Sequence, residues 1–223
     1  MGEMIQFKRP DGRAGSGYLA VPSHGEAAPG VVVVQEWWGL QAQIKGVADR
    51  FAEAGFRALA PDLYEGRIAR DAGEASQMMN GLDFVDAAQQ DVRGAVRHLK
   101  MSGGKVAVTG FCMGGAITLI AAVHVPECDA AVCFYGIPPE EAADPRSVRV
   151  PFQGHFADQD GWCNPKAVND LEKGLASAAV PAEIHRYAAQ HAFFNEQRPE
   201  VHDPAAATLA WERSIKFLRK HLG

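Results

Sequence analysis

The hydrophobic and polar positions of the N-terminal part predict strands first and a helix afterwards. Residues 3–9 and 14–21 have the pattern of two short strands, joined by a turn at Pro10-Asp11-Gly12. A β-branched run over residues 30–35 follows, and runs of this kind are typical of a parallel strand buried on both faces. Apolar residues then recur at helical spacing from Ile44 to Gly55, which predicts a helix packed on that strand.

The rest of the chain alternates between predicted strands and predicted helices. Short apolar runs predict strands over residues 57–60, 105–109, 130–135, 150–156 and 182–187. Helical spacing predicts helices over 73–101, with a break near Gly81, and over 116–123. Two further helices should begin at Asn164-Pro165 and Asp203-Pro204, where a capping side chain precedes a proline. This alternation predicts a mostly parallel central sheet with helices on both faces, in a single domain spanning residues 1–223.

Composition and charge exclude several classes of protein. The chain has 223 residues, 47% of them hydrophobic, which is ordinary globular usage and enough for a sizeable core. Its net charge of −5 gives no general attraction for nucleic acid or anionic lipid. No apolar run approaches the roughly 20 residues that cross a bilayer, and the first ten residues lack a signal-peptide core. We therefore expect a cytoplasmic protein with neither membrane nor nucleic-acid partners.

The segment around Cys112 carries the strongest chemical signal. It reads Gly110-Phe-Cys112-Met-Gly114-Gly115 between a predicted strand and a predicted helix, which is the nucleophile-elbow pattern with Cys in place of Ser. Such a turn presents the sulfur at the carboxyl edge of the sheet, near a helix N-terminus that favours the thiolate. The Met113 N–H would then point to where an oxyanion forms. The alternative is a glycine-rich turn around a buried thiol.

A thiol nucleophile needs a base, and the base needs an acid to orient it. In enzymes with a nucleophile elbow of this kind, the order along the chain is nucleophile, acid, histidine. Asp158 and Asp160 both follow a predicted strand, and we favour Asp160 because it lies just before the next helix, while Asp158 remains the alternative. His191 follows the last predicted strand, which is where the base belongs. No cysteine pair or His-Cys spacing predicts a metal site, and no cofactor is expected.

Together these residues resemble the dienelactone hydrolase family of α/β-hydrolases over nearly the whole chain. The resemblance rests on Gln35-Glu36-Trp37-Trp38-Gly39-Leu40, Pro61-Asp62-Leu63-Tyr64, the elbow, the Asp160 loop and Gln190-His191-Ala-Phe-Phe-Asn195. It implies an α/β-hydrolase fold and hydrolysis of a small ester or lactone. The typical substrate is 4-carboxymethylenebut-2-en-4-olide, a dienelactone from the degradation of aromatic compounds.

The resemblance also implies roles for individual residues. Cys112 would be the nucleophile of a catalytic triad, His191 its base and Asp160 the acid that orients the base. Glu36 would contact the resting thiol until the carboxylate of the substrate displaces it. The backbone N–H of Trp37 would be the second donor of the oxyanion hole, beside that of the elbow.

The substrate-binding side departs from the family. Asn195 stands where the family has an arginine that binds the substrate carboxylate, and Arg198 is the nearest substitute. The region 73–82 also lacks an arginine, with Arg67 and Arg70 nearby. The candidate substrate-binding residues are Trp38, Tyr64, Phe194, Asn195 and Arg198. The expected partner is a small-molecule ester or lactone, and the chain is expected to be a monomer or a small homo-oligomer.

Three other functions remain open at the level of sequence. The first is a carboxylesterase or thioesterase of broad range with the same triad. The second is a non-catalytic member of the fold that binds a small molecule. The third is a thiol peptidase or amidotransferase, although those enzymes often place their histidine directly after the cysteine, where this chain has Met113.

Overall fold

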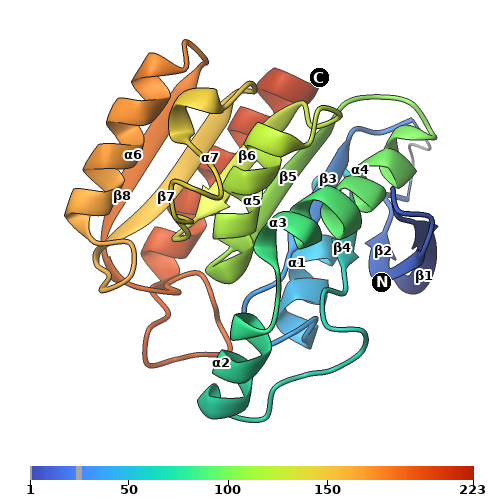
Figure 1. Ribbon diagram of the computed structural model, residues 1–223, viewed down its shortest axis with the longest axis horizontal. Helices are drawn as coiled ribbons and strands as arrows, with labels where there is room; N and C mark the ends of the chain where they lie inside the picture. The colour runs from blue at the N-terminus through green and yellow to red at the C-terminus, as the bar shows by residue number, and fades with distance from the viewer. Residues whose placement is uncertain (1, 24–26) are drawn as a thin grey trace.

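The computed structural model describes residues 2–23 and 27–223, which form one eight-stranded sheet. Its strands lie in the order β1-β2-β4-β3-β5-β6-β7-β8, as can be followed from the blue β1 to the orange β8 in Figure 1. The strands are β1 (Glu3–Lys8), β2 (Ala14–Ala20), β3 (Gly30–Val34), β4 (Arg57–Pro61), β5 (Val106–Phe111), β6 (Ala130–Phe134), β7 (Phe152–Gln159) and β8 (Ala182–Gln190). β2 pairs antiparallel with β1 and β4, and every other pairing is parallel, as the alternating pattern predicts.

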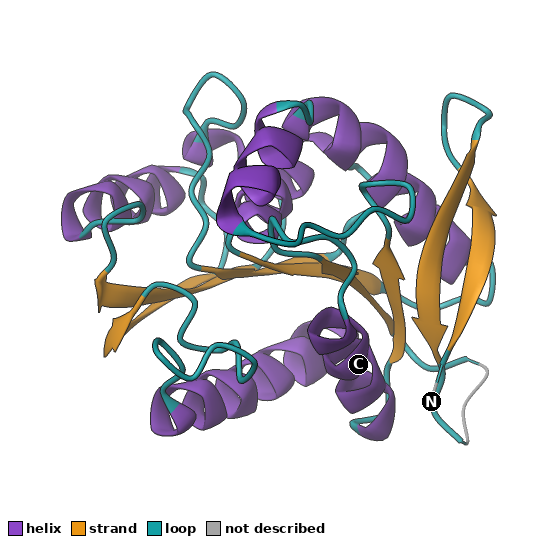
Figure 2. Ribbon diagram, turned by 90° about the horizontal axis from the view of Figure 1, so that it is seen from below, coloured by secondary structure: helices purple, strands orange, loops and turns teal. Residues whose placement is uncertain are grey.

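Helices cover both faces of the sheet, as predicted (Figure 2). They are α1 (Ala42–Glu53), α2 (Ala72–Asn80), α3 (Phe84–Ala87), α4 (Arg93–Lys100), α5 (Met113–His124), α6 (Pro165–Ser177) and α7 (Pro204–Leu222). The valine run of β3 explains why two layers of helices are needed. Val32 and Val34 belong to a core with apolar side chains of α4, α5 and α6, whereas Val31 and Val33 belong to a core with those of α1 and α7.

Two predicted helices differ in detail from the structure. Residues 73–101 do break at Gly81, which ends α2, but the second part contains a π-helical turn over Ala88–Val92 between α3 and α4. The helix predicted over 116–123 begins earlier, at Met113. Both differences arise because apolar spacing reveals neither an extra residue within a helix nor a first turn that contains two glycines.

No helix in residues 2–23 and 27–223 is both long and apolar enough to cross a membrane. The cytoplasmic location, the oligomeric state and the single domain stay predictions.

Candidate active site

The parallel strands bring five chemically important residues to one edge of the sheet. Glu36 follows β3, Cys112 follows β5, Tyr135 follows β6, Asp160 follows β7 and His191 follows β8. Because parallel strands place their carboxyl ends at the same edge, residues that are far apart in the sequence become neighbours. Sequence reasoning places four of them there and misses Tyr135.

Cys112 lies in the tight turn that the elbow pattern predicts. Its backbone has φ 56° and ψ −117°, a conformation that L-residues rarely adopt, and it caps the N-terminus of α5. The glycines on either side permit this turn. A Cβ atom at Gly110 would overlap the carbonyl group of Gly114, and one at Gly114 would overlap the carbonyl groups of Val34 and Gln35. The turn therefore requires glycine at both places, because the backbones approach too closely for a side chain.

Asp160, and not Asp158, contacts the predicted base. Its Oδ2 atom accepts a hydrogen bond of 2.7 Å from Nδ1 of His191. Its Oδ1 atom accepts from the backbone N–H groups of Trp162, at 2.7 Å, and Cys163, at 3.0 Å. Asp158 is an exposed residue of β7. The geometry therefore supports the choice of Asp160 made from the position of the next helix.

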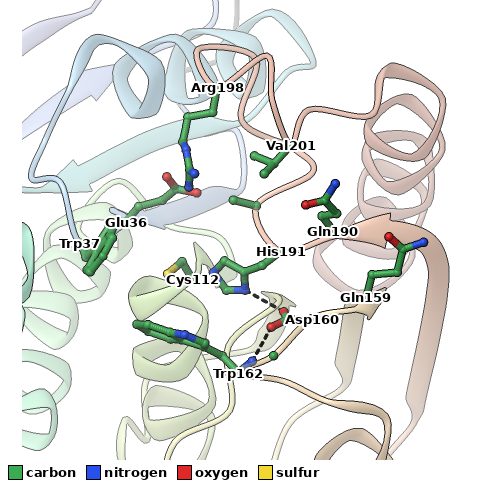
Figure 3. Close-up of a pocket in the computed structure, with 12 residues that line it drawn as sticks. Glu36, Trp37, Cys112, Gln159, Asp160, Trp162, Gln190, His191, Arg198 and Val201 are labelled. Atoms are coloured by element: carbon green, nitrogen blue, oxygen red, sulfur yellow. Dashed lines mark hydrogen bonds and ion pairs between the residues drawn. The ribbon is translucent and has the colours of Figure 1, made fainter. Parts of the chain in front are cut away.

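The protonation of His191 follows from its partners. Burial disfavours the imidazolium ion, but hydrogen bonds to Asp160 and Cys112 outweigh it and raise the pKa of His191 to about 10. Burial also opposes the charged form of Asp160, yet the hydrogen bond from His191 leaves the pKa of this carboxyl group below its usual value. Figure 3 shows the ring of His191 between Asp160 and the sulfur of Cys112. The arrangement is suited to moving a proton from sulfur to nitrogen.

The carboxylate of Glu36 has hydrogen-bond partners other than the resting thiol. Glu36 is only 3% exposed, and its Oε2 atom accepts a hydrogen bond of 2.8 Å from the amide of Asn195. Its Oε1 atom accepts a hydrogen bond of 3.4 Å from the hydroxyl group of Tyr135. No hydrogen bond among the described residues joins Glu36 to Cys112. Each carboxylate oxygen can still accept a second donor, so the contact with the thiol stays a prediction.

Burial raises the pKa of Glu36, and the hydrogen bond from Asn195 and the positive charges of His191 and Arg198 only partly offset this effect. The carboxyl group is therefore a buried acid that gains a proton more readily than a solvated glutamate does.

A cavity of about 270 Å³ opens beside Cys112. One wall is aromatic, with the rings of Trp37 and Trp162 edge to face and their centroids 5.9 Å apart. The opposite side carries Gln159, Gln190, Arg198 and Val201 (Figure 3). The site can therefore hold a small, flat molecule between an aromatic wall and a polar one.

Of the five candidate substrate-binding residues, only Arg198 lines this cavity. The other four do not line it in the described part of the chain: Trp38, Tyr64, Phe194 and Asn195. Phe194 stacks on Phe111 in the core, with ring centroids 5.1 Å apart, and Asn195 is occupied by Glu36. Closeness to a motif along the chain does not determine the direction of a side chain, and the binding roles of these four residues stay predictions.

Sequence reasoning also missed cavity residues that stand next to predicted ones. Gln159 directly precedes Asp160, Gln190 directly precedes His191, and Trp162 lies in the Asp160 loop. Trp162 is 59% exposed, and its ring lies 5.7 Å from that of His191, measured between centroids. The available signal was position: a residue that flanks a catalytic candidate at a strand end often faces the same edge.

The remaining three cysteines are buried thiols that form thiolates less readily than a free thiol. Burial raises the pKa of both Cys128 and Cys133 to about 12, and it raises the pKa of Cys163 as well. Within residues 2–23 and 27–223 there is no group of three or more His, Cys, Asp or Glu side chains placed to hold a metal ion.

Comparisons with known proteins identify a matching family, related sequences and a related structure. The model of the "Dienelactone hydrolase family" matches residues 16–222. "Protein usf" of Aquifex pyrophilus is 38% identical, and a "Putative carboxymethylenebutenolidase" of Aquifex aeolicus is 34% identical, with 100% of both chains covered in each case. The crystal structure of a "Putative Dienelactone Hydrolase" from Klebsiella pneumoniae superposes with a TM-score of 0.86 at 24% identity and covers 99% of each chain. That superposition confirms the predicted α/β-hydrolase fold.

Proposed function

Because the chain belongs to the dienelactone hydrolase family, and is therefore a hydrolase acting on ester bonds, we propose that it cleaves a small ester or lactone through Cys112, His191 and Asp160. The observation that carries this proposal is the 2.7 Å hydrogen bond from His191 to the buried Asp160, with Cys112 on the other side of the imidazole ring. The three groups have the order of nucleophile, base and orienting acid that acyl transfer requires.

The proposed reaction has two halves. His191 takes the proton of the Cys112 thiol, and the thiolate attacks the carbonyl carbon of the ester. The backbone N–H groups of Met113 and Trp37 would stabilise the oxyanion, since Met113 is the first residue of α5 and Trp37 lines the cavity. The leaving alkoxide takes the proton from His191, and a thioester remains on Cys112. Water, activated by His191, then hydrolyses the thioester.

A dienelactone of the 4-carboxymethylenebut-2-en-4-olide type is the proposed substrate. The name of the relative from Aquifex aeolicus supports this choice. So does the cavity, which combines the aromatic wall of Trp37 and Trp162 with the cation of Arg198. A flat conjugated ring would lie against the tryptophans, and its carboxylate would pair with the guanidinium group.

A broad-range carboxylesterase or thioesterase with the same triad is the second candidate. It is favoured by Asn195, which is bound to Glu36 and does not line the cavity. Arg198 is then the one lining residue with a permanent positive charge, and its Nε atom already donates to Glu200 at 2.9 Å. A cavity with a single lining arginine, already paired with Glu200, would also accept neutral esters. Family membership argues against the non-catalytic alternative and against the peptidase or amidotransferase.

The test is hydrolysis of cis- and trans-dienelactone, followed by ultraviolet absorbance, with p-nitrophenyl acetate in parallel. The parent is compared with Cys112→Ala and with Cys128→Ala, a matched control that removes a buried thiol elsewhere. We expect rapid loss of dienelactone with the parent and the control, and none with Cys112→Ala. Hydrolysis of the acetate alone would favour the second candidate. Equal activity of Cys112→Ala and the parent would overturn the triad.

A further inference from the structure

The last two strands of the sheet lose their regular register just before the active site. Ala157 of β7 lies opposite Tyr187 of β8. Two residues further along β7, Gln159 lies opposite Gln190, which is three residues further along β8. Irregularities of this kind re-aim side chains and are common beside active sites. Here the irregularity makes the two glutamines a cross-strand pair at the carboxyl end of the sheet.

The register shift also explains how the acid and the base of the proposed triad meet. Asp160 and His191 are the next residues of the two segments, and they are joined by the 2.7 Å hydrogen bond. In a regular register, Asp160 would lie opposite Gln190 instead. The glutamine pair therefore stands directly beside the acid and the base, and all four residues line the same cavity.

The glutamine pair lies on the side of the cavity where the alcohol part of an ester would be. In Figure 3 both glutamines lie beyond His191, whereas Trp37 lies on the other side of Cys112. In the proposed reaction, His191 gives its proton to the leaving alkoxide, so the alcohol part must lie next to the imidazole ring. Gln159 and Gln190 therefore flank the alcohol part and not the acyl part.

The two carboxamides offer hydrogen bonds without a charge. Each has two N–H donors and one carbonyl acceptor. Gln159 and Gln190 are exposed, so a ligand in the cavity can reach them. The guanidinium group of Arg198 extends toward Glu36 in Figure 3, and its positive charge acts on the carboxyl group of Glu36. The side next to His191 is thus suited to an oxygen-bearing group, whether or not that group is charged.

We infer that Gln159 and Gln190 together bind an oxygen-bearing group on the alcohol part of the substrate, and that they are specificity-determining residues. The inference rests on the proposed function and names the substrate class of the same site: esters and lactones whose alcohol part carries such an oxygen. A dienelactone belongs to this class, because its carboxylate is attached, through one carbon, to the carbon that bears the ring oxygen. The monoester of a diol is an uncharged member of the class.

The experiment compares 2-hydroxyethyl acetate with propyl acetate, which differ only by a hydroxyl group in place of a methyl group at the end of the alcohol part. A pH-stat measures the hydrolysis, and each kcat/KM is divided by the rate constant for hydrolysis of that ester by hydroxide. Because the hydroxyl group is uncharged, the corrected ratio reports hydrogen bonding and not pairing with Arg198. Methyl 3-hydroxypropanoate and methyl butanoate form the matched pair for the acyl part.

The variants are Gln159→Leu, Gln190→Leu and the double variant. Gln77→Leu, at an exposed glutamine of α2, makes the same change elsewhere and is the control. Both esters of a pair are hydrolysed by the same folded molecules, so the ratio does not depend on how much of a variant is folded.

The parent should prefer 2-hydroxyethyl acetate about fivefold after correction, which is a typical net effect of one hydrogen bond. Each single variant should lower this preference about twofold, and the double variant should remove it, mainly through a higher KM for the hydroxylated ester. Gln77→Leu should keep the full preference. The acyl pair should show no preference in any of the proteins, because the glutamines lie on the other side of the scissile bond.

Three results would overturn the inference: a corrected ratio near one in the parent, an unchanged ratio in the double variant, or a preference confined to the acyl pair. Hydrolysis of p-nitrophenyl acetate separates this failure from failure of the proposed function. A parent that hydrolyses this ester through Cys112 but shows no preference for the hydroxylated alcohol refutes the inference alone. A parent that hydrolyses no ester refutes the proposed function, and the inference falls with it.

Discussion

Two histidines on neighbouring strands have opposite acid–base properties. His191 follows β8 and bonds to a carboxylate, whereas His155 lies within β7 and bonds to neutral groups. Nδ1 of His155 is 2.7 Å from the hydroxyl group of Tyr187, and its Nε2 is 3.0 Å from the amide oxygen of Gln153 and 3.1 Å from the hydroxyl group of Ser214.

The difference between the two rings is set by their partners. Burial lowers the pKa of His155 well below its usual value, and the nearby positive charges of His185 and Arg213 lower it further. Burial acts on His191 in the same direction, but the carboxylate of Asp160 and the thiol outweigh it and raise its pKa to about 10. Burial alone therefore predicts the direction of the pKa shift for His155 but not for His191. A carboxylate partner makes a histidine a proton acceptor, and neutral partners make it a structural hydrogen-bonding group.

The largest expected effect is that of His191→Ala. Loss of the base should lower kcat for p-nitrophenyl acetate by about 10³-fold or more, since His191 is the group proposed to take the thiol proton. Steady-state kinetics measure this directly. His124→Ala, at an exposed histidine outside the cavity, should retain activity within about twofold. Equal losses of activity in both variants would mean that His191 is not the catalytic base.

The next effect is on stability and concerns His155→Leu. This change keeps the bulk of the side chain and leaves Tyr187, Gln153 and Ser214 without their buried partner. The free energy of unfolding should fall by about 2–4 kcal/mol, as measured by urea denaturation. The kcat of the folded fraction should stay within about threefold. A large loss of kcat with unchanged stability would mean that His155 acts in catalysis.

The pH dependence of stability separates the two rings by sign. The folded-state pKa of His155 is lowered. Its contribution to the free energy of unfolding is therefore present above the unfolded-state pKa of about 6.5 and is lost as the pH falls below that value. The loss has a limiting slope of about 1.4 kcal/mol per pH unit. The folded-state pKa of His191 is raised. Its contribution to the free energy of unfolding is therefore present below pH 6.5 or about that value, and it is lost as the pH rises through about 10.

Urea midpoints of the parent and of His155→Leu between pH 5 and pH 8 test this prediction. The parent should lose stability toward pH 5, and the variant should show a smaller slope there. An identical slope in both proteins would assign the acid sensitivity to other groups.

The smallest effect concerns the aromatic neighbours of the two histidines. The ring of Phe134 stacks on His155 inside the core, with centroids 4.6 Å apart, whereas Trp162 borders His191 at the open side of the cavity. Trp162→Ala should raise the KM for aryl esters about three- to tenfold and leave kcat within about twofold, because it removes binding surface and not the base. Trp162→Phe should keep most of the affinity. A fall in kcat at constant KM would instead make Trp162 part of the proton-transfer geometry.

Much of the site could be predicted because its residues occupy strand ends. Cys112 stands out through the glycines of its turn, and His191 through its place after the last strand. The choice of Asp160 over Asp158, made because Asp160 lies just before the next helix, agrees with the hydrogen bond to His191. The catalytic roles of all three stay predictions until the variants are measured.

What sequence reasoning could not supply was the direction of side chains and the partners they meet. Phe194 and Asn195 directly follow the His191 segment, yet one joins the core and the other bonds to Glu36. Tyr135 was missed because its contact with Glu36 joins residues that lie 99 positions apart. Such contacts depend on how strands and loops lie in space, and no short-range pattern records them.

By itself, the sequence determined the order of strands and helices, the parallel sheet and the elbow at Cys112. Each of these depends on local periodicity or on a glycine that the backbone requires. Only the tertiary structure decided how burial and partners set the protonation of His155 and His191, and that Glu36 is held by Asn195 and Tyr135. The physical reason is that protonation depends on burial and on partners a few ångströms away, and those partners come from segments that only folding brings together.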